Sequence, residues 1–185
     1  MQELKKDSPA YVEHLFNLFV EVLHETVTVK PLQNVGAEMT PALAQGLQFL
    51  SRHGVCSIRD IAQGLQMTYS AASQLTERLV KRGLVTRREN ERDRRLSEIK
   101  LTEDGLQVVE RIRVHRIESI THILDRMNEA RRLALVGDLE SFIAAAIENE
   151  KSALKACSHC GTDHLAECVV NEIYKAATGT PIDEI

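Results

Sequence analysis

The segment Leu84–Gly105, LVTRRENERDRRLSEIKLTEDG, decides what the rest of the chain can be. Runs of β-branched and apolar residues lie on both sides of a polar, turn-prone centre at 88–94. This pattern predicts two short strands joined in a hairpin whose tip points into solvent. The arginines at the tip favour a nucleic-acid partner, because a guanidinium group is permanently charged and can hold a phosphate through two hydrogen bonds. A solvated, salt-bridged loop is the alternative interpretation.

Two helical segments precede this hairpin, at 58–65 (IRDIAQGL) and 69–83 (YSAASQLTERLVKRG), and a very short connection around Met67 and Thr68 separates them. This is the spacing of a helix-turn-helix. Each segment repeats apolar residues at helical intervals, so each has one face for the core. The opposite face of the second segment carries short polar side chains that can approach base edges or phosphates, and Thr68 or Ser70 also suits the N-cap.

The order helix-turn-helix, then KRGLVTR at 81–87, then DRRLSEIKLTEDG at 93–105 resembles the winged-helix transcription regulators of the MarR family. In that family an Asp-x-Arg wing motif is followed about five residues later by Leu-Thr-x-x-Gly at the start of a long helix. The segment 40–54 also looks like the family's second helix, and the resemblance covers about residues 8–150. It implies an obligate homodimer, a recognition helix in each major groove, a wing arginine in a minor groove, and a ligand pocket beside the dimer helices.

The predicted fold class is mainly α: a winged helix-turn-helix domain of three helices and a two- to three-stranded β-wing, with long helices forming a dimerisation domain. Amphipathic stripes predict long helices at 9–29, which Pro31 ends, at 102–127, and at 129–153 after a break at Asn128. A winged domain cannot cover all three stripes, so dimerisation is the economical interpretation and an intramolecular three-helix bundle is the alternative. The predicted parts are an N-terminal dimerisation helix at 1–36, the winged domain at 37–102, dimerisation helices at 103–153, and a Cys-rich extension with a short helix at 154–185.

Charge is distributed unevenly along the 185 residues, whose formal net charge is −4. The segment 78–100 holds nine Lys or Arg against four Asp or Glu, a local charge of +5, and the remainder carries −9. Positive charge is therefore concentrated where DNA is expected. No apolar run approaches a bilayer span, and the start MQELKKD is polar, so a soluble, cytoplasmic protein is expected. No glycine-rich nucleotide loop, Ser/His/Asp set or HExxH motif is present, so neither catalysis nor an organic cofactor is expected.

Near the C-terminus, the segment 157–168, CSHCGTDHLAEC, places Cys157, Cys160, His164 and Cys168 close together. A C-x2-C pair can share one ion through a tight turn, and residues four apart lie on one face of a helix. The spacing predicts a Cys3His metal site, with zinc as the leading candidate. It is similar to the zinc-knuckle pattern but shorter in its two later gaps, so the RNA-binding role of that motif is not transferred.

Three other interpretations of this cluster stay open. The three cysteines could hold an iron-sulfur cluster with His164, another residue or the partner chain as the fourth ligand. The C-x2-C pair could be a thiol switch, or the cysteines could border a packed helix at 163–177 with Leu165, Val169 and Ile173 as its apolar stripe. Cys56, beside residues that look core-facing, is interpreted as a small buried side chain.

The resulting hypothesis is a cytoplasmic, homodimeric regulator, a repressor by first expectation, that binds a pseudo-palindromic duplex site. A ligand, metal or redox event would alter the spacing of its two recognition helices. The alternative is a metal- or cluster-carrying interaction module that binds protein or RNA. The residues assigned to DNA are Thr68, Ser70, Ser73, Gln74 and Arg78 on the helix, Arg92, Arg94 and Arg95 on the wing, and Asp93, which orients a wing arginine.

Overall fold

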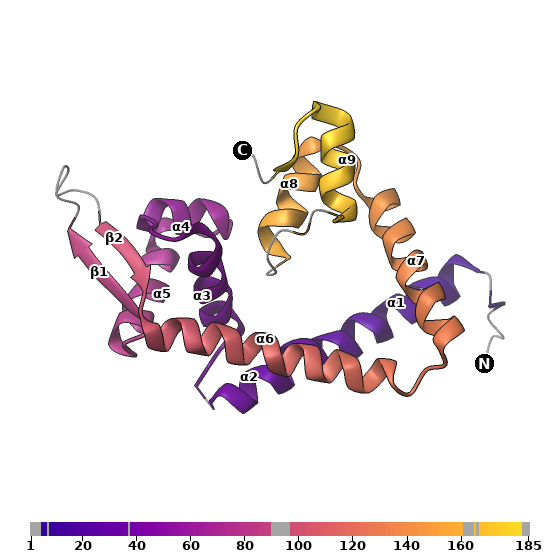
Figure 1. The fold of residues 1–185 in the computed structure, drawn as a ribbon, viewed down its shortest axis with the longest axis horizontal. Coiled ribbons are helices and arrows are strands. Elements are labelled where there is room, and N and C mark those ends of the chain that lie inside the picture. The colour runs from indigo at the N-terminus through magenta and orange to yellow at the C-terminus, as the bar shows by residue number, and fades with distance from the viewer. Residues whose placement is uncertain are drawn as a thin grey trace.

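The structure is a computed structural model that describes residues 5–6, 8–36, 38–89, 97–160, 165 and 167–182, the side chains of Glu89 and His159 excepted. Figure 1 shows a winged domain at one end of a long helix, α6, and further helices at its other end. The fold is mainly helical with a small antiparallel sheet, which confirms the predicted fold class. The helices and strands are α1 (Pro9–Leu23), η1 (His24–Val29), α2 (Lys30–Val35), α3 (Pro41–His53), α4 (Ile58–Gly64), α5 (Tyr69–Lys81), β1 (Val85–Glu89), β2 (Ser97–Leu101), α6 (Glu103–Leu124), α7 (Glu129–Ala146), α8 (Glu150–His159) and α9 (Val169–Thr178).

The wing is the hairpin that the sequence predicts. Strands β1 and β2 pair in antiparallel register from Val85 opposite Leu101 to Glu89 opposite Ser97. Cys56 adds a bridge opposite Ile99, with backbone N···O distances of 3.0 and 2.8 Å. The predicted two to three strands are therefore observed as a two-stranded sheet with one bridging residue beside it.

The core of the winged domain is built from one apolar face of each surrounding element. Its largest fully buried apolar side chains come from α3, α4, α5, β2 and the first half of α6. They are Leu47, Leu50, Ile61, Leu79, Ile99 and Ile112. Each such side chain contributes about 1.5–3 kcal/mol on leaving water, so this core holds the helix-turn-helix, the wing and α6 together.

At the N-terminus the prediction that Pro31 ends the first helix is wrong. The chain continues from α1 through the π-helical turn η1 into α2, whose first turn contains Pro31. In η1 the bonding is shifted, so that the Lys30 N–H donates to the carbonyl of Glu25. Because this shift lets a new helix start at Lys30, the missing N–H of Pro31 falls in a first turn, where no intrahelical bond is needed.

The C-terminal helices also differ from the prediction. The single helix expected at 129–153 is divided, because Ile147 is extended and a capping box of Asn149 and Ser152 starts α8. The short helix expected at 163–177 begins only at Val169, so Leu165 does not belong to its stripe. Local side-chain hydrogen bonds to the backbone therefore override the longer apolar pattern at 147–152.

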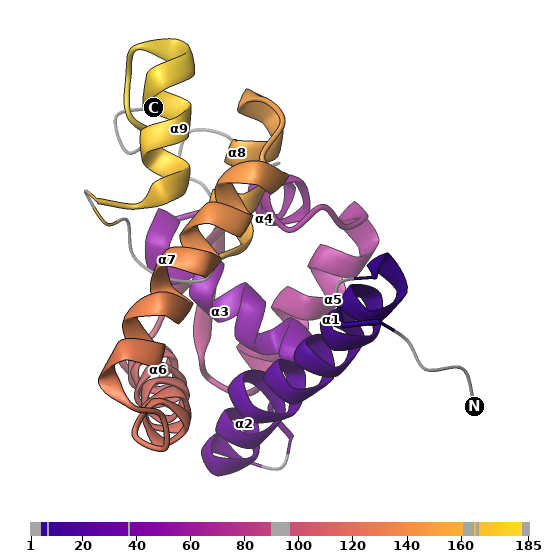
Figure 2. The ribbon, with the colours of Figure 1, turned by 90° about the vertical axis from the view of Figure 1, so that its right-hand side faces the viewer.

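Helices α1 and α7 meet at Phe16 and Phe142, whose ring centroids are 4.9 Å apart. Each still exposes much apolar surface in the single chain, including Leu15 and Phe19 on α1 and Leu133 on α7, which is 67% exposed. Figure 2 shows α7 running from the end of α6 up to α8 and α9, which lie side by side. Within the described part of the chain, no helix is both long and apolar enough to cross a membrane.

Candidate nucleic-acid interface

The turn between α4 and α5 is defined by local hydrogen bonds. Helix α4 begins with a capping box in which Asp60 N–H donates to the Ser57 hydroxyl oxygen at 3.2 Å and Ser57 N–H donates to the Asp60 carboxylate at 2.8 Å. Helix α5 begins where Thr68 Oγ1 accepts from the Ala71 N–H at 3.2 Å. Thr68 is thus the N-cap, as predicted, and each cap of this kind contributes about 1 kcal/mol.

Close packing at the end of α4 requires Gly64. A Cβ atom there would lie 2.1 Å from the ring of Phe49, which is buried in the core. The glycine therefore lets α4 approach α3 closely, and this contact fixes the angle at which the chain enters the turn. The sequence alone did not explain why glycine is needed at position 64.

Helix α5 turns one face inward and the other outward. Ala72, Leu75 and Leu79 are buried and anchor it. Ser70, Gln74 and Arg78 are exposed, and Ser73 is half-buried at the edge. The predicted polar residues are thus brought together on one accessible face of a rigidly held helix, which fits a helix that reads a groove.

The base of the wing presents further positive charge close to α5. Arg87 and Arg88 lie on β1 and are exposed, and Arg87 Nε donates to the Ser97 hydroxyl at 3.1 Å across the hairpin. Arg82, just after α5, pairs with Glu38 at 2.9 Å. The predicted wing residues Arg92, Asp93, Arg94 and Arg95 lie outside the described residues, so their assignment stays a prediction.

Thr102 joins the wing, α5 and α6 at one point. Its hydroxyl donates to the Gly83 carbonyl at 2.7 Å and accepts from the Gly105 N–H at 3.0 Å, while its N–H donates to the Leu84 carbonyl at 3.0 Å. A Cβ atom on Gly105 would lie 2.1 Å from that same Leu84 oxygen. The Leu-Thr-x-x-Gly motif is therefore a packing motif: threonine ties the junction, and glycine permits the close approach.

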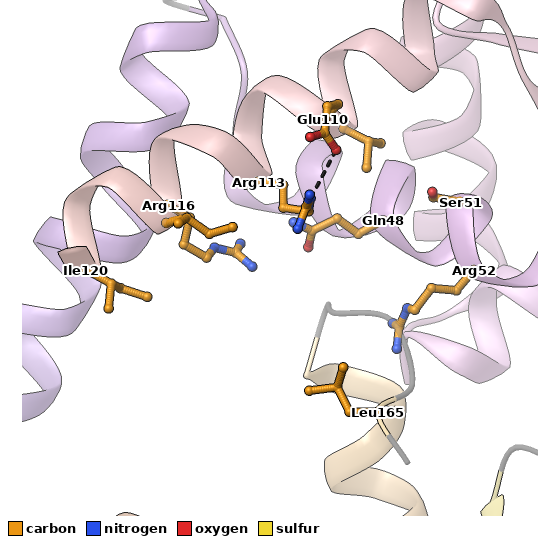
Figure 3. Close-up of a pocket in the computed structure, with 10 residues that line it drawn as sticks. Gln48, Ser51, Arg52, Glu110, Arg113, Arg116, Ile120 and Leu165 are labelled. Atoms are coloured by element: carbon orange, nitrogen blue, oxygen red, sulfur yellow. Dashed lines mark hydrogen bonds and ion pairs between the residues drawn. The ribbon is translucent and has the colours of Figure 1, made fainter. Parts of the chain in front are cut away.

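A cavity of about 480 Å³ lies between α3 and α6, beside Leu165 of the C-terminal extension (Figure 3). Its walls are apolar at Val109, Ile117 and Ile120 and basic at Arg52, Arg113 and Arg116. Arg113 pairs with Glu110 at 3.0 Å, and burial lowers the pKa of Arg116 from its usual value. Among the residues that the structure describes, the buried Nε atoms of Arg52 and Arg116 have no hydrogen-bond partner. This combination suits an amphipathic anion, and no residue pattern in the sequence identified it.

Arg52 connects this cavity to the cysteine-rich extension. It lies in the last turn of α3, and its Nη1 and Nη2 donate to the carbonyls of Cys157 and Ser158 at 3.1 and 2.7 Å. These two carbonyls belong to the end of α8. A contact between residues more than a hundred positions apart is not visible in any local sequence pattern.

Cys157 and Cys168 are half-buried and Cys160 is exposed. Within the described ranges no three His, Cys, Asp or Glu side chains are grouped as a metal site, and His164 lies outside those ranges. The predicted Cys3His zinc site stays a prediction, and so do its alternatives, an iron-sulfur cluster and a thiol switch. Cys56, in contrast, is 5% exposed, as expected for a core residue. Burial, aided by the charge of Asp60, raises the pKa of its thiol to about 11.

The α4–turn–α5 unit, its wing and the long α6 define a winged helix-turn-helix protein. Residues 38–96 match a family model described as "MarR family". The Bacillus subtilis "HTH-type transcriptional repressor MdtR" is 25% identical over 139 residues, which span 75% of this chain and 90% of that protein. These matches identify residues 38–96 as a MarR-family domain, and they support the interpretation of the chain as a winged-helix transcription regulator of that family.

Solved structures agree with this assignment. RV1404 from Mycobacterium tuberculosis has a TM-score of 0.64 and 27% identity, over 76% of this chain and 95% of that one. A Staphylococcus aureus MepR–DNA complex has the same fold, with a TM-score of 0.59 and 22% identity, over 73% of this chain and 99% of that one. About a quarter of the present chain thus lies outside each of these matches.

Proposed function

We propose that the protein is a homodimeric, cytoplasmic transcription regulator that binds a pseudo-palindromic duplex and acts as a repressor. The observation that carries this proposal is the outward polar face of α5, held by a buried face and flanked by the arginines of β1. Ser70, Ser73, Gln74 and Arg78 read the major groove. The wing arginines Arg92, Arg94 and Arg95 reach phosphates or the adjacent minor groove, with Asp93 orienting one of them. A MepR structure of this fold is a DNA complex, and MdtR is named a repressor, which supports both parts.

Dimerisation is supported by the apolar surface that the single chain leaves in water. Val12, Leu15 and Phe19 on α1, with Val136 and Leu139 on α7, are all exposed. Exposed apolar side chains in this number on two helices are typical of a partner interface. A second copy would bury it and set the distance between the two recognition helices at about one helical turn of DNA.

The cavity between α3 and α6 supports modulation by a small anionic effector. It joins the winged domain to the helices of the proposed interface, so a ligand that bridges α3 and α6 would favour one relative orientation of these parts. Such a ligand shifts DNA binding only if it binds the two orientations with different affinity. Arg116 and Arg52 supply its positive side, and Ile117 and Ile120 its apolar side.

Fluorescence-polarisation titrations against genomic duplex fragments, with RNA as competitor, test the DNA assignment. We expect Gln74→Ala and Arg78→Ala each to weaken specific binding by about 1–3 kcal/mol, and neutralisation of Arg94 to reduce the salt dependence. Arg131→Ala, an exposed arginine on α7, is the matched control and should change nothing.

If RNA competes equally well with duplex DNA, the alternative module that binds protein or RNA replaces this proposal. If Arg94 and Arg95 variants keep both the affinity and its salt dependence, the wing assignment is wrong. Light scattering across a concentration series tests the dimer, because Leu133→Glu on the exposed face of α7 should yield monomers.

A further inference from the structure

The hairpin formed by α8 and α9 has almost no core of its own. The two helices pack against each other, and Figures 1 and 2 show them side by side. Among its described residues, the buried apolar side chains are Ala153 and Tyr174, and neither belongs to the core cluster of the winged domain. Units of this size fold stably only with a disulfide, a metal or a partner. The hairpin is held in part by the contact of α9 with α7 and by Arg52 of α3, and with so small a core of its own it is a place where a metal would add stability.

The cysteines lie where a bound metal would connect the two helices. Cys157 is in the last turn of α8, Cys160 is its C-cap, and Cys168 is the N-cap of α9. Helices α8 and α9 run in opposite directions (Figure 1), so the end of α8 and the start of α9, which carry these residues, lie at the same end of the hairpin. Three thiolates would fill three of the four positions that zinc takes in a structural site.

Cys168 is an unusual N-cap for this protein. Thr40, Thr68 and Asn128 cap their helices with a side-chain oxygen that accepts a backbone N–H, whereas Cys168 makes no such bond. A thiol is a poor cap, whereas its sulfur is a zinc ligand. Cys168 is therefore better suited to bind a metal than to cap α9.

Arg52 ties the same turn to the DNA-binding domain. Its guanidinium donates to the carbonyls of Cys157 and Ser158, where a helix C-terminus favours a cation. The N–H of Cys160 donates to the same Cys157 carbonyl at 3.3 Å. The backbone of the C-x2-C turn and the end of α3 therefore share one acceptor.

We propose that Cys157, Cys160 and Cys168 bind one zinc-class ion and that its loading reaches α3 through Arg52. Each thiol releases one proton as its sulfur becomes a ligand, so no oxidant is needed. Within the described residues these side chains are not yet grouped around one point. The proposed site therefore requires the ends of α8 and α9 to approach each other when the ion binds, and a movement of α8 would displace the two carbonyls that Arg52 holds. The regulatory half of this inference rests on the proposed function, whereas the metal half does not.

Metal content is the first test, made on the full-length protein purified without oxygen or chelator. We expect about one zinc per chain, no visible absorption band, and at least a tenfold loss of zinc affinity in Cys160→Ser and Cys168→Ser. Cys56→Ser, which removes a buried thiol outside the hairpin, is the matched control and should keep its zinc.

Several results would overturn the metal site. They are chains that remain metal-free after zinc is added, wild-type zinc affinity in Cys168→Ser, iron with a brown visible band, or a Cys157–Cys160 disulfide that forms in place of metal binding. The last two would establish the iron-sulfur and thiol-switch interpretations instead.

The coupling is tested with Arg52→Gln and with Arg111→Gln, an exposed arginine of α6, as control. All variants should bind zinc. The wild type and Arg111→Gln should change duplex affinity at least fivefold on zinc loading, and Arg52→Gln less than twofold. An unchanged zinc response in Arg52→Gln would disprove the role of Arg52.

Hydrogen exchange of the α3 amides, with and without zinc, measures the same coupling in the absence of DNA. If no variant binds duplex, the proposed function fails while this measurement and the zinc content still decide the inference. Zinc-dependent protection of α3 that persists in Arg52→Gln would overturn the coupling.

Discussion

The winged domain and the α8–α9 hairpin are stabilised in opposite ways. In the winged domain, five elements share one core of fully buried Leu and Ile side chains, and its turns are capped by Ser57, Thr68 and Thr102. In the hairpin, Ala153 and Tyr174 are the buried apolar side chains among the described residues. We therefore expect the first region to keep its shape when a ligand binds and the second to respond to the ion proposed above. This difference suits a rigid winged domain for the proposed DNA binding and a less stable hairpin that responds to a ligand.

Cysteine reactivity should separate the two regions by the largest factor. Cys56 lies in the winged core with a thiol pKa raised to about 11, so its thiolate is about a hundredfold scarcer at pH 8 than that of an ordinary thiol. We expect iodoacetamide to modify Cys160 of the metal-free protein at least tenfold faster than Cys56, as followed by mass spectrometry. Equal rates would mean that the winged core opens as easily as the hairpin.

The same pKa shift predicts a loss of stability at high pH. Because the folded pKa of Cys56 lies above the unfolded value, ionisation is easier in the unfolded chain. The contribution of this thiol is therefore complete below about pH 8.5 and declines as the pH rises toward 11. In denaturant titrations, the difference in free energy of unfolding between wild type and Cys56→Ser should be constant below about pH 8.5 and should change only in that window.

A pair of glycine substitutions sharpens the comparison between close-packed and open positions. Gly105→Ala should lower the free energy of unfolding by about 1–3 kcal/mol, because the new Cβ meets the backbone oxygen of Leu84. Gly137→Ala in the middle of α7 meets nothing within 4 Å and should raise helix stability by about 0.5–1 kcal/mol. Urea unfolding measures both, and a neutral Gly105→Ala would show that the junction of wing and α6 is loose.

The smallest effect is expected at the start of α8. Asn149→Ala removes the side chain that accepts from the Ser152 N–H at 3.0 Å and should cost about 1 kcal/mol. Because the hairpin has little else to hold it, hydrogen exchange should rise throughout α8 and α9 while the amides of α5 stay protected. Uniform loss of protection would instead show that the hairpin and the winged core unfold as one unit.

Much of the winged domain could be predicted from the sequence because its signals are local. The apolar faces of α4 and α5, the cap at Thr68 and the hairpin around residues 90–96 depend on residues within one or two turns of each other. The errors arose where two local signals compete. At Pro31 a π-helical turn restores the helix, and at Asn149 a capping box breaks one.

The parts of the site that could not be predicted depend on contacts between distant segments. Arg52 and Cys157 are brought together by the fold, and the arginine-lined cavity needs α3, α6 and Leu165 at once. The need for glycine at 105 becomes clear only when the Leu84 carbonyl is in place. Charge and residue type predicted a DNA-binding face, but neither predicted the connection between that face and the extension.

Because the hydroxyl of Thr102 ties one end of α6 to the winged domain, a small tilt of this helix gives a larger displacement at its other end. This helix has 22 residues and is thus about 33 Å long, and its near end is held by the core contacts of Val108 and Ile112 and by the bond from that hydroxyl to the Gly83 carbonyl, between α5 and β1. A tilt of only about 5° about this pivot would move the far end of α6 by about 3 Å. Conversely, a displacement of a few ångströms where α6 meets α7 would rotate the winged domain by a few degrees. A shift far from the proposed DNA-binding face could therefore change the orientation of that face without deforming it.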